Sequence, residues 1–472
     1  MLKKGQQFEC TIEDLGFGGN GIVHIDGFVI FIKGAIPEQE VRAVVTKKKS
    51  DYAEAKVLEV LKKSPKEILA KCKHFGVCGG CIWQNLKYED QIIYKGKQVY
   101  DCIKRIGKIE SKDNDSMRIL QSPQVFGYRN KLEFSFGYQS MRVERDEEGN
   151  KKYFDEDPTL GFHKPRKWQE VVDIEYCYLA SENINSIFDI VKKWSFSQKE
   201  EVHNPKTHKG FWRQLLIREN SQGQLLINII VNKDVAPEFF ETLLPLINKK
   251  NVIHSVFFTI HKGLNDDWTQ GEIIKLSGED RIYEEVLDMK FTISPESFFQ
   301  TNTKGAEILY KTVLDFVKKS YVGNKELKSF DKSKSINYLN ILDLYCGTGT
   351  IGQVVGRHLK NLESSDTKKG LEVQVIGLEL LESAVKDAYK NAEINGLKNV
   401  EYISGPAEKT FPQVLEKYKT FDVVIVDPPR AGMHPKALQT LLQVHAKNII
   451  YVSCNPATLA RDLKILATNN YQ

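Results

Sequence analysis

The chain of 472 residues lacks the features that mark membrane and secreted proteins. No apolar run approaches the roughly 18 residues that a transmembrane helix needs, and nothing near the N-terminus has the pattern of a signal peptide. We therefore expect a cytoplasmic protein, by default a monomer. In that compartment its eight cysteines are expected to be mostly reduced thiols, so clustering among them indicates metal binding or catalysis.

A large excess of one charge is also missing, since the formal net charge is only +5. The charge is unevenly distributed, because residues 63–112 hold eleven Lys and Arg against five Asp and Glu. Such a local surplus suits a polyanion such as nucleic acid, and an ordinary solvated face explains it equally well. The length, with 41% hydrophobic residues, predicts two to three domains.

Residues 1–62 form the first predicted domain. Short β-rich runs alternate with glycine-marked turns from Phe8 to Val60, a pattern typical of a small OB-like β-barrel. Such barrels commonly bind nucleic acid on one face. The stretches Gly16–Val23, Phe28–Ile32 and Gly34–Pro37 resemble the TRAM domain, a module attached to RNA-modifying enzymes.

Residues 63–290 form the second predicted domain, which we expect to be β-rich with a few helices. The expected elements are a helix at 85–106 and strands at 127–136, 211–218, 224–232 and 252–260. Arg129 and Lys131 lie on the first of these strands, where a contact with substrate competes with an ordinary charged, exposed strand face. We expect His203 and His208, on a polar loop, to be surface residues.

A cysteine cluster opens this second domain. Cys72, Cys78 and Cys81 lie within ten residues, and Cys177 is the natural fourth ligand. Four thiolates fit tetrahedral zinc or a [4Fe–4S] cluster. We favour the cluster because zinc sites usually pair two Cys-x-x-Cys knuckles and only one is present. A redox-active Cys-x-x-Cys is the third possibility, although no thioredoxin-like pattern surrounds it.

From residue 291 strands alternate with helices, which predicts a doubly wound parallel sheet. The strand at 340–345 enters a glycine-rich turn, Cys346–Gly352, whose backbone can approach a ligand closely. Alone, this turn could equally mark a dinucleotide site. The next strand ends in Glu379, placed to accept hydrogen bonds from ribose hydroxyls, and a third ends in Asp427–Arg430. Polar insertions are expected at 320–338 and 361–372, and a charged hairpin tip at 147–150.

The stretch Ile449–Thr458 is an apolar run that stops in a turn carrying Cys454. An unpaired cysteine is most often a buried core residue. Here the turn formers Ser453, Asn455 and Pro456 surround it, so Cys454 is expected at the rim of the sheet, where α/β domains keep their chemistry.

Asp427–Gly432 together with Ser453–Thr458 resemble the RNA 5-methyluridine methyltransferases, in the subclass with a TRAM domain and an iron–sulfur cluster. The resemblance runs from about residue 8 to 468 and includes Ser297–Asn302. It implies a Rossmann-like, S-adenosylmethionine-dependent methyltransferase domain at 291–472. It also implies that Cys454 is the nucleophile. The same resemblance implies two sets of binding residues. The expected metal ligands are Cys72, Cys78, Cys81 and Cys177. The residues expected to bind S-adenosylmethionine are Gln300, Tyr345, Gly347, Glu379 and Asp427.

The implied reaction methylates carbon 5 of a uridine in RNA after the thiolate adds to carbon 6. Large-subunit (23S) ribosomal RNA is the expected substrate, because the relatives that act on tRNA typically lack the barrel and the cluster; tRNA is the alternative. Cytosine-5 methylation is disfavoured, because Arg430 and Ala431 stand where those enzymes place a second cysteine.

The family's general base, a glutamate, would lie beyond residue 472. We therefore expect a truncated enzyme, with a non-catalytic RNA-binding or folding factor as the alternative.

Overall fold

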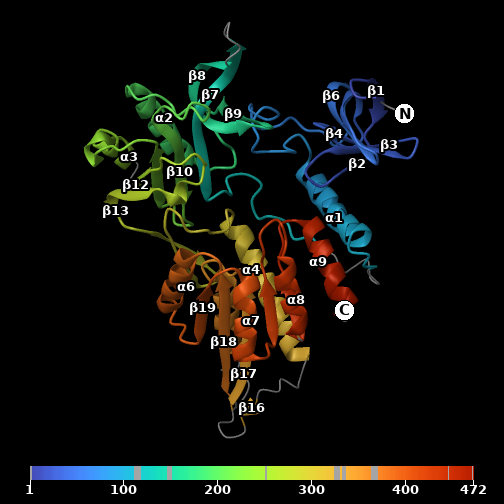
Figure 1. Ribbon diagram of the computed structural model, residues 1–472, viewed down its shortest axis with the longest axis vertical. Coiled ribbons are helices and arrows are strands. Elements are labelled where there is room, and N and C mark those ends of the chain that lie inside the picture. Colours follow the sequence, from blue (N-terminus) through green and yellow to red (C-terminus); the bar gives the residue numbers. More distant parts are fainter. Residues whose placement is uncertain are drawn as a thin grey trace.

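The computed structural model describes residues 3–110, 118–145, 151–249, 252–323, 330–331, 336–362, 370–444, 446–469 and 471. Figure 1 shows an N-terminal β-rich unit in blue beside a green central unit, both above an orange and red C-terminal unit. The predicted hairpin tip at 147–150 and parts of the predicted insertions lie outside the described residues. None of the helices in the described ranges is long and apolar enough to cross a membrane.

The N-terminal unit is one sheet in the order β1-β5-β6-β4-β3-β2. Its strands are β1 (Gln7–Thr11), β2 (Asp14–Leu15), β3 (Gly21–Ile25), β4 (Phe28–Lys33), β5 (Glu40–Lys48) and β6 (Tyr52–Lys62). Alternate side chains point inward, so Ile30, Ile32, Ala53 and Ala55 share one small core. The prediction of a β-rich first domain is confirmed.

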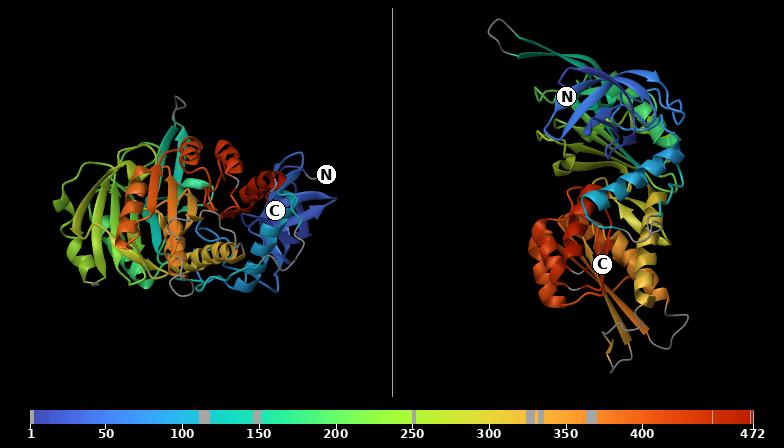
Figure 2. Two further views of the ribbon diagram at one scale, coloured as in Figure 1. Left: turned by 90° about the horizontal axis from the view of Figure 1, so that it is seen from below. Right: turned by 90° about the vertical axis from the view of Figure 1, so that its right-hand side faces the viewer.

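Helix α1 (Tyr88–Arg105) connects this unit to the rest of the molecule. Gln98 Nε2 donates to the carbonyls of Leu15 and Gly16 at 3.1 and 3.2 Å, and Lys97 pairs with Asp14. The opposite end of the chain meets the same helix, because α9 (Pro456–Thr468) packs against α1. Figures 1 and 2 show α1 lying between the blue sheet and the red C-terminal helices. The first unit is thus fixed next to the element that follows Cys454.

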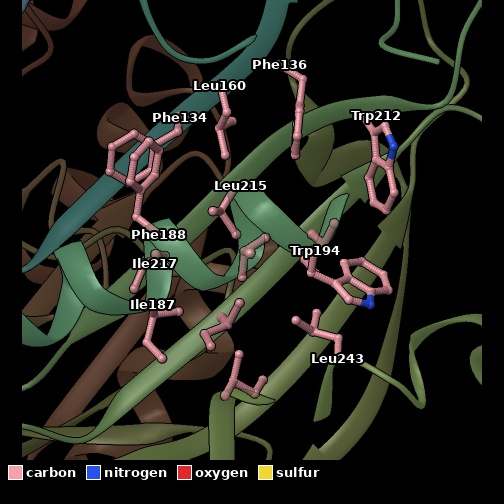
Figure 3. Close-up of a cluster of buried hydrophobic side chains, with 14 of the residues drawn as sticks. Phe134, Phe136, Leu160, Ile187, Phe188, Trp194, Trp212, Leu215, Ile217 and Leu243 are labelled. Carbon is pink, nitrogen blue, oxygen red and sulfur yellow. The ribbon is translucent and has the colours of Figure 1, made fainter. Parts of the chain in front are cut away.

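The central unit is built on a sheet in the order β13-β12-β11-β10-β7-β8-β9. These strands are β7 (Lys131–Arg145), β8 (Lys151–Lys164), β9 (Lys167–Asp173), β10 (Trp212–Glu219), β11 (Leu225–Val231), β12 (Ile253–Ile260) and β13 (Glu272–Gly278). The helical elements are α2 (Glu182–Ser197), η2 (Pro237–Phe240), α3 (Leu244–Asn248) and η3 (Trp268–Gln270). The core between α2 and the sheet combines aliphatic side chains with large aromatic ones, among them Phe134, Phe188, Trp194 and Trp212 (Figure 3). The strands predicted at 211–218, 224–232 and 252–260 are found within one or two residues, whereas the strand predicted at 127–136 begins only at Lys131 and continues to Arg145.

One prediction in this unit is wrong. His208 is exposed as expected, but His203 is buried, with 8% of its surface accessible. The loop is drawn onto the sheet because the His203 N–H donates to the carbonyl of Trp212 at 2.8 Å. Burial, with the positive charge of Arg213, lowers the pKa of His203 to about 4.

The C-terminal unit is a parallel sheet in the order β19-β18-β17-β20-β21, with β16 antiparallel to β17, preceded by the hairpin β14-β15. The strands are β14 (Ile282–Val286), β15 (Met289–Ile293), β16 (Phe330–Asp331), β17 (Ile336–Leu344), β18 (Gly370–Glu379), β19 (Val400–Ser404), β20 (Val423–Val426) and β21 (Asn448–Tyr451). The helices are α4 (Thr303–Gly323), α5 (Thr350–Leu362), α6 (Glu382–Ile394), α7 (Ala407–Tyr418), α8 (Pro435–Gln443) and α9.

Both faces of this sheet are covered, as a doubly wound fold requires. Ile341 and Val375 pack with α4 and α5 on one face, whereas Leu342 and Val424 pack with α7 and α8 on the other. The chain leaves β17 for β18 on one side and reaches β20 on the other. This reversal places a crevice at the carboxyl end of β17, where such folds bind ligands. The predicted parallel sheet is confirmed.

Candidate active site

Four of the predicted site residues lie at the carboxyl ends of neighbouring strands. Tyr345 follows β17, Glu379 ends β18, Asp427 follows β20 and Cys454 lies just after β21. Hydrogen bonds hold these ends together, because the Asp427 N–H donates to the carbonyl of Leu344 at 3.2 Å. The structure therefore brings these residues to one edge of the sheet.

The glycine-rich turn after β17 is shaped by its backbone and by Glu379. The Gly347 N–H donates to Glu379 Oε2 at 3.0 Å, so this carboxylate closes the turn from the neighbouring strand. Gly349 has a φ of +77°, and a Cβ there would lie 2.7 Å from Tyr402 Oη. Only glycine fits at this position. Tyr345 itself has a φ of +65°, an uncommon conformation for a non-glycine residue.

A pocket opens beside this turn. Gln300, Tyr345, Gly347 and Asp427 all line it, and Glu379 contacts it through Gly347. Gln300 lies in the segment before α4. Its backbone carbonyl accepts a hydrogen bond from Asn130 Nδ2 at 2.8 Å. Four of the five residues predicted to bind one ligand thus line one pocket, and the fifth, Glu379, bonds to its wall at Gly347.

Two carboxyl groups, that of the buried Asp343 and that of the half-buried Asp427, line this pocket. Burial raises the pKa of Asp427 to about 6. Asp343, which sequence reasoning missed, also lines the pocket, and burial raises its pKa to about 7. Its Oδ2 accepts a hydrogen bond from the Gly352 N–H at 2.9 Å, whereas its Oδ1 is buried without a partner among the described residues. An acidic residue within the apolar strand before the glycine turn was the available signal. Two carboxyl groups of this kind suit a positively charged ligand.

Cys454 is exposed, so the prediction of a rim position is confirmed. Its turn is fixed by its neighbours, because the Asn455 side chain caps α9 by accepting from the Ala457 N–H at 3.1 Å. Asn455 Nδ2 and Thr458 Oγ1 also donate to the carbonyl of Arg430 at 3.1 and 3.2 Å. These bonds join the cysteine turn to the loop that follows Asp427.

Asp462, which was not predicted from the sequence, holds the same two segments together from the buried side. This carboxylate is buried and accepts hydrogen bonds from the Met433 N–H at 2.9 Å and Tyr451 Oη at 2.6 Å. Arg461 Nε donates to its other oxygen at 2.8 Å. Gly432 approaches closely, since a Cβ there would lie 2.8 Å from Asp462 Oδ2. The position of Cys454 relative to Asp427 is therefore set by helix α9.

The second predicted site is a cavity of about 220 Å³ in the central unit. Its lining includes all four predicted ligand cysteines, namely Cys72, Cys78, Cys81 and Cys177. Burial, together with the negative charge of the neighbouring thiolates, raises the pKa of the Cys78 thiol to about 11. No group of three or more His, Cys, Asp or Glu side chains in the described ranges is placed to hold a metal ion. The four cysteines line one cavity, and the metal cluster stays a prediction.

Arg129 and Lys131, expected on a strand that enters the central sheet, are both partly buried. Arg129 lines the cysteine cavity. Lys131 pairs with Glu133 at 2.7 Å, and burial lowers its pKa. Neither residue therefore belongs to an ordinary exposed strand face.

Comparison with known proteins shows what kind of protein carries this site. Residues 2–58 match the TRAM domain family, and residues 337–471 match a methyltransferase domain family. An uncharacterized RNA methyltransferase of Caldanaerobacter subterraneus subsp. tengcongensis is 36% identical over 475 residues, covering 100% of this chain and 94% of that relative. Another, of Clostridium tetani, is 36% identical over 474 residues, covering 100% and 93%. The chain belongs to this RNA methyltransferase family.

A solved structure shares the whole fold with this RNA methyltransferase. The tRNA (uracil-54, C5)-methyltransferase of Pyrococcus abyssi, in complex with S-adenosyl-L-homocysteine, superimposes with a TM-score of 0.68 at 24% identity, covering 97% of this chain and 93% of that one. The predicted combination of a TRAM domain with a methyltransferase fold is confirmed.

Proposed function

We propose that this RNA methyltransferase transfers a methyl group to carbon 5 of a uridine in structured RNA, with Cys454 as the nucleophile. The observation that carries the proposal is the position of Cys454. This thiol is exposed at the sheet edge that also holds Tyr345, Glu379 and Asp427. A thiol next to a methyl-donor pocket has a chemical use, because carbon 5 of uracil is a poor nucleophile until something adds at carbon 6.

In this proposal the donor lies beside the glycine turn. Glu379 accepts hydrogen bonds from the ribose hydroxyls while its Oε2 also holds the Gly347 N–H at 3.0 Å. Gln300, Tyr345 and Asp427 line the pocket in which the donor would lie. The unpartnered Oδ1 of Asp343 accepts a hydrogen bond from the donor's ammonium group. S-adenosylmethionine supplies an electrophilic methyl group at this site.

The proposed chemistry begins with addition of the Cys454 thiolate to carbon 6 of the uracil. The electron pair of the 5,6 double bond moves into an enolate, and carbon 5 then attacks the donor's methyl carbon. S-adenosylhomocysteine leaves with the electrons of the broken sulfur–carbon bond. A base removes the proton from carbon 5, the double bond re-forms and the thiolate is expelled. Splitting the substitution in this way lowers each barrier.

The uridine must leave its stack to reach Cys454, which costs a few kcal/mol and favours a loop nucleotide. The TRAM domain and the basic stretch 63–112 would bind the flanking RNA. Helix α1 lies in that stretch and packs against α9, the helix that follows Cys454. An RNA bound to the first unit is therefore held beside the active-site turn.

The four cysteines of the central cavity are proposed to hold a [4Fe–4S] cluster. What supports this proposal is that all four thiols line one cavity of about 220 Å³, and four cysteine thiolates are the usual ligands of such a cluster. The cluster would cross-link residues 72–81 to Cys177, which is distant in sequence. Anaerobic purification followed by iron and sulfide analysis tests this, with Cys81→Ser as the variant that should lose both. Zinc without sulfide would contradict it.

Large-subunit ribosomal RNA is the proposed substrate, and tRNA is the second candidate because the Pyrococcus abyssi neighbour acts on uracil 54 of tRNA. Incubating the protein with labelled donor and either a 23S ribosomal RNA or a tRNA transcript separates the two. Nuclease digestion should then release the label as 5-methyluridine from one transcript. Label in another nucleoside, such as 5-methylcytidine, would refute the proposed position.

A further inference from the structure

The segment that enters the central sheet forms part of the wall of the cysteine cavity. The Gly127 N–H donates to the carbonyl of Tyr178, and the Arg129 N–H donates to that of Leu179, both at 2.9 Å. These two carbonyls directly follow Cys177 in the chain. Because Arg129 also lines the cavity, the segment cannot shift without moving that wall.

The next residue, Asn130, bonds instead to the segment that carries Gln300. Its Nδ2 donates to the carbonyl of Gln300 at 2.8 Å and to Thr303 Oγ1 at 2.9 Å, and its N–H donates to the carbonyl of Thr301 at 3.0 Å. Asn130 is itself held in the sheet, because the Glu219 N–H donates to its carbonyl at 2.8 Å. One residue of the central unit thus makes three hydrogen bonds to the segment that carries Gln300.

The far end of that segment is also anchored. Thr303 Oγ1 donates to Glu284 Oε2 at 2.8 Å, and Glu284 is fully buried. Gln300 lies between this anchor and Phe299, which is buried in the methyltransferase core. The carbonyl that Asn130 holds belongs to Gln300 itself, so this contact sets the backbone from which the pocket-lining side chain projects.

We propose that Asn130 is a positioning residue that fixes Gln300 for methyl-donor binding, and that through it the wall of the cysteine-lined cavity is coupled to donor affinity. The inference rests on the proposed role of Gln300 in the donor pocket. It assigns to the central unit a part in donor binding that is separate from holding RNA.

Titration calorimetry of the full chain with S-adenosylhomocysteine, without RNA, tests the first half. Asn130→Ala removes two side-chain hydrogen bonds and should weaken binding about tenfold. Asn130→Asp, which keeps the shape but replaces the donating group by an acceptor, should weaken it as much. Asn183→Ala is the matched control, because Asn183 Nδ2 donates to Glu219 at 2.8 Å without touching residues 300–303. Unchanged affinity in Asn130→Ala, or an equal loss in the control, would overturn the assignment.

A double-mutant cycle tests the coupling. Cys177→Ser alters the cavity wall and should weaken binding at least threefold when Asn130 is present, but leave the affinity of the Asn130→Ala protein unchanged. If the loss of affinity in the double variant equals the product of the losses in the two single variants, the coupling is overturned. Cys81→Ser, on another wall of the cavity, gives the same test if the first variant does not fold by circular dichroism. Because no RNA is used, failure here leaves uridine methylation untouched, and failure of that function leaves this result standing.

Discussion

The buried carboxyl group of Asp343 predicts how methyl-donor binding depends on pH. Its pKa is raised to about 7, mainly by burial, and its Oδ1 has no partner among the described residues. If the ionised form binds the donor's ammonium group, affinity should rise with pH through this pKa. The ionised fraction grows from about 0.09 at pH 6 to about 0.76 at pH 7.5, so affinity should rise about eightfold while the donor's amino group stays mostly protonated.

The assay is calorimetric titration of the protein with S-adenosylmethionine at pH 6 and pH 7.5, without RNA. The Asp343→Asn variant should bind the donor weakly at both pH values. Its affinity should rise much less with pH, because only Asp427, with a pKa of about 6, still titrates at the site. Thermal unfolding of the variant should stay close to that of the unaltered protein, because the buried group is largely neutral below pH 7. Equal affinity at the two pH values, or an undiminished slope in Asp343→Asn, would refute the reasoning.

Two further predictions concern the loops of the site. Asp462→Ala removes the Oδ2 acceptor that the buried Met433 N–H and Tyr451 Oη share, so the free energy of unfolding in urea should fall by about 1–3 kcal/mol; a loss below that of Tyr451→Phe would contradict the role of Asp462. Gly349→Ala should abolish donor binding, because its φ is +77° and the new Cβ meets Tyr402 Oη at 2.7 Å. Gly396→Ala, at a φ of +64° with nothing within 4 Å, is the control for backbone strain alone and should bind normally.

The sequence predicted those site residues whose position follows from a single element. Parallel strands present their carboxyl ends at one edge, so an acidic residue or a cysteine that ends an apolar run can be placed without knowing the side-chain contacts. Glu379, Asp427 and Cys454 were found in this way. Cys177 was matched to three distant cysteines because the other candidates lay in a barrel and a helix.

The missed residues act across tertiary contacts. Asn130 holds the carbonyl of a residue 170 positions away, and nothing in its own strand pattern marks it. Asp462 looks like an ordinary polar position of a surface helix, yet it is buried against Tyr451 and Met433. The exposure of His203 was predicted wrongly for the same reason. A polar loop predicts exposed side chains, but here the His203 N–H bonds to the carbonyl of Trp212 and holds the loop against the sheet. Such partners are decided by how the elements pack.

The central claim is that Cys454 adds covalently to carbon 6 of the target uridine. The most direct test is to incubate the protein and methyl donor with RNA transcribed from 5-fluorouridine triphosphate. Fluorine at carbon 5 cannot leave as a proton does, so the intermediate should accumulate. The account predicts a denaturation-resistant protein–RNA complex whose cross-linked peptide contains Cys454, and no complex with Cys454→Ala. A complex that survives in Cys454→Ala, or a cross-link at another cysteine, would contradict it.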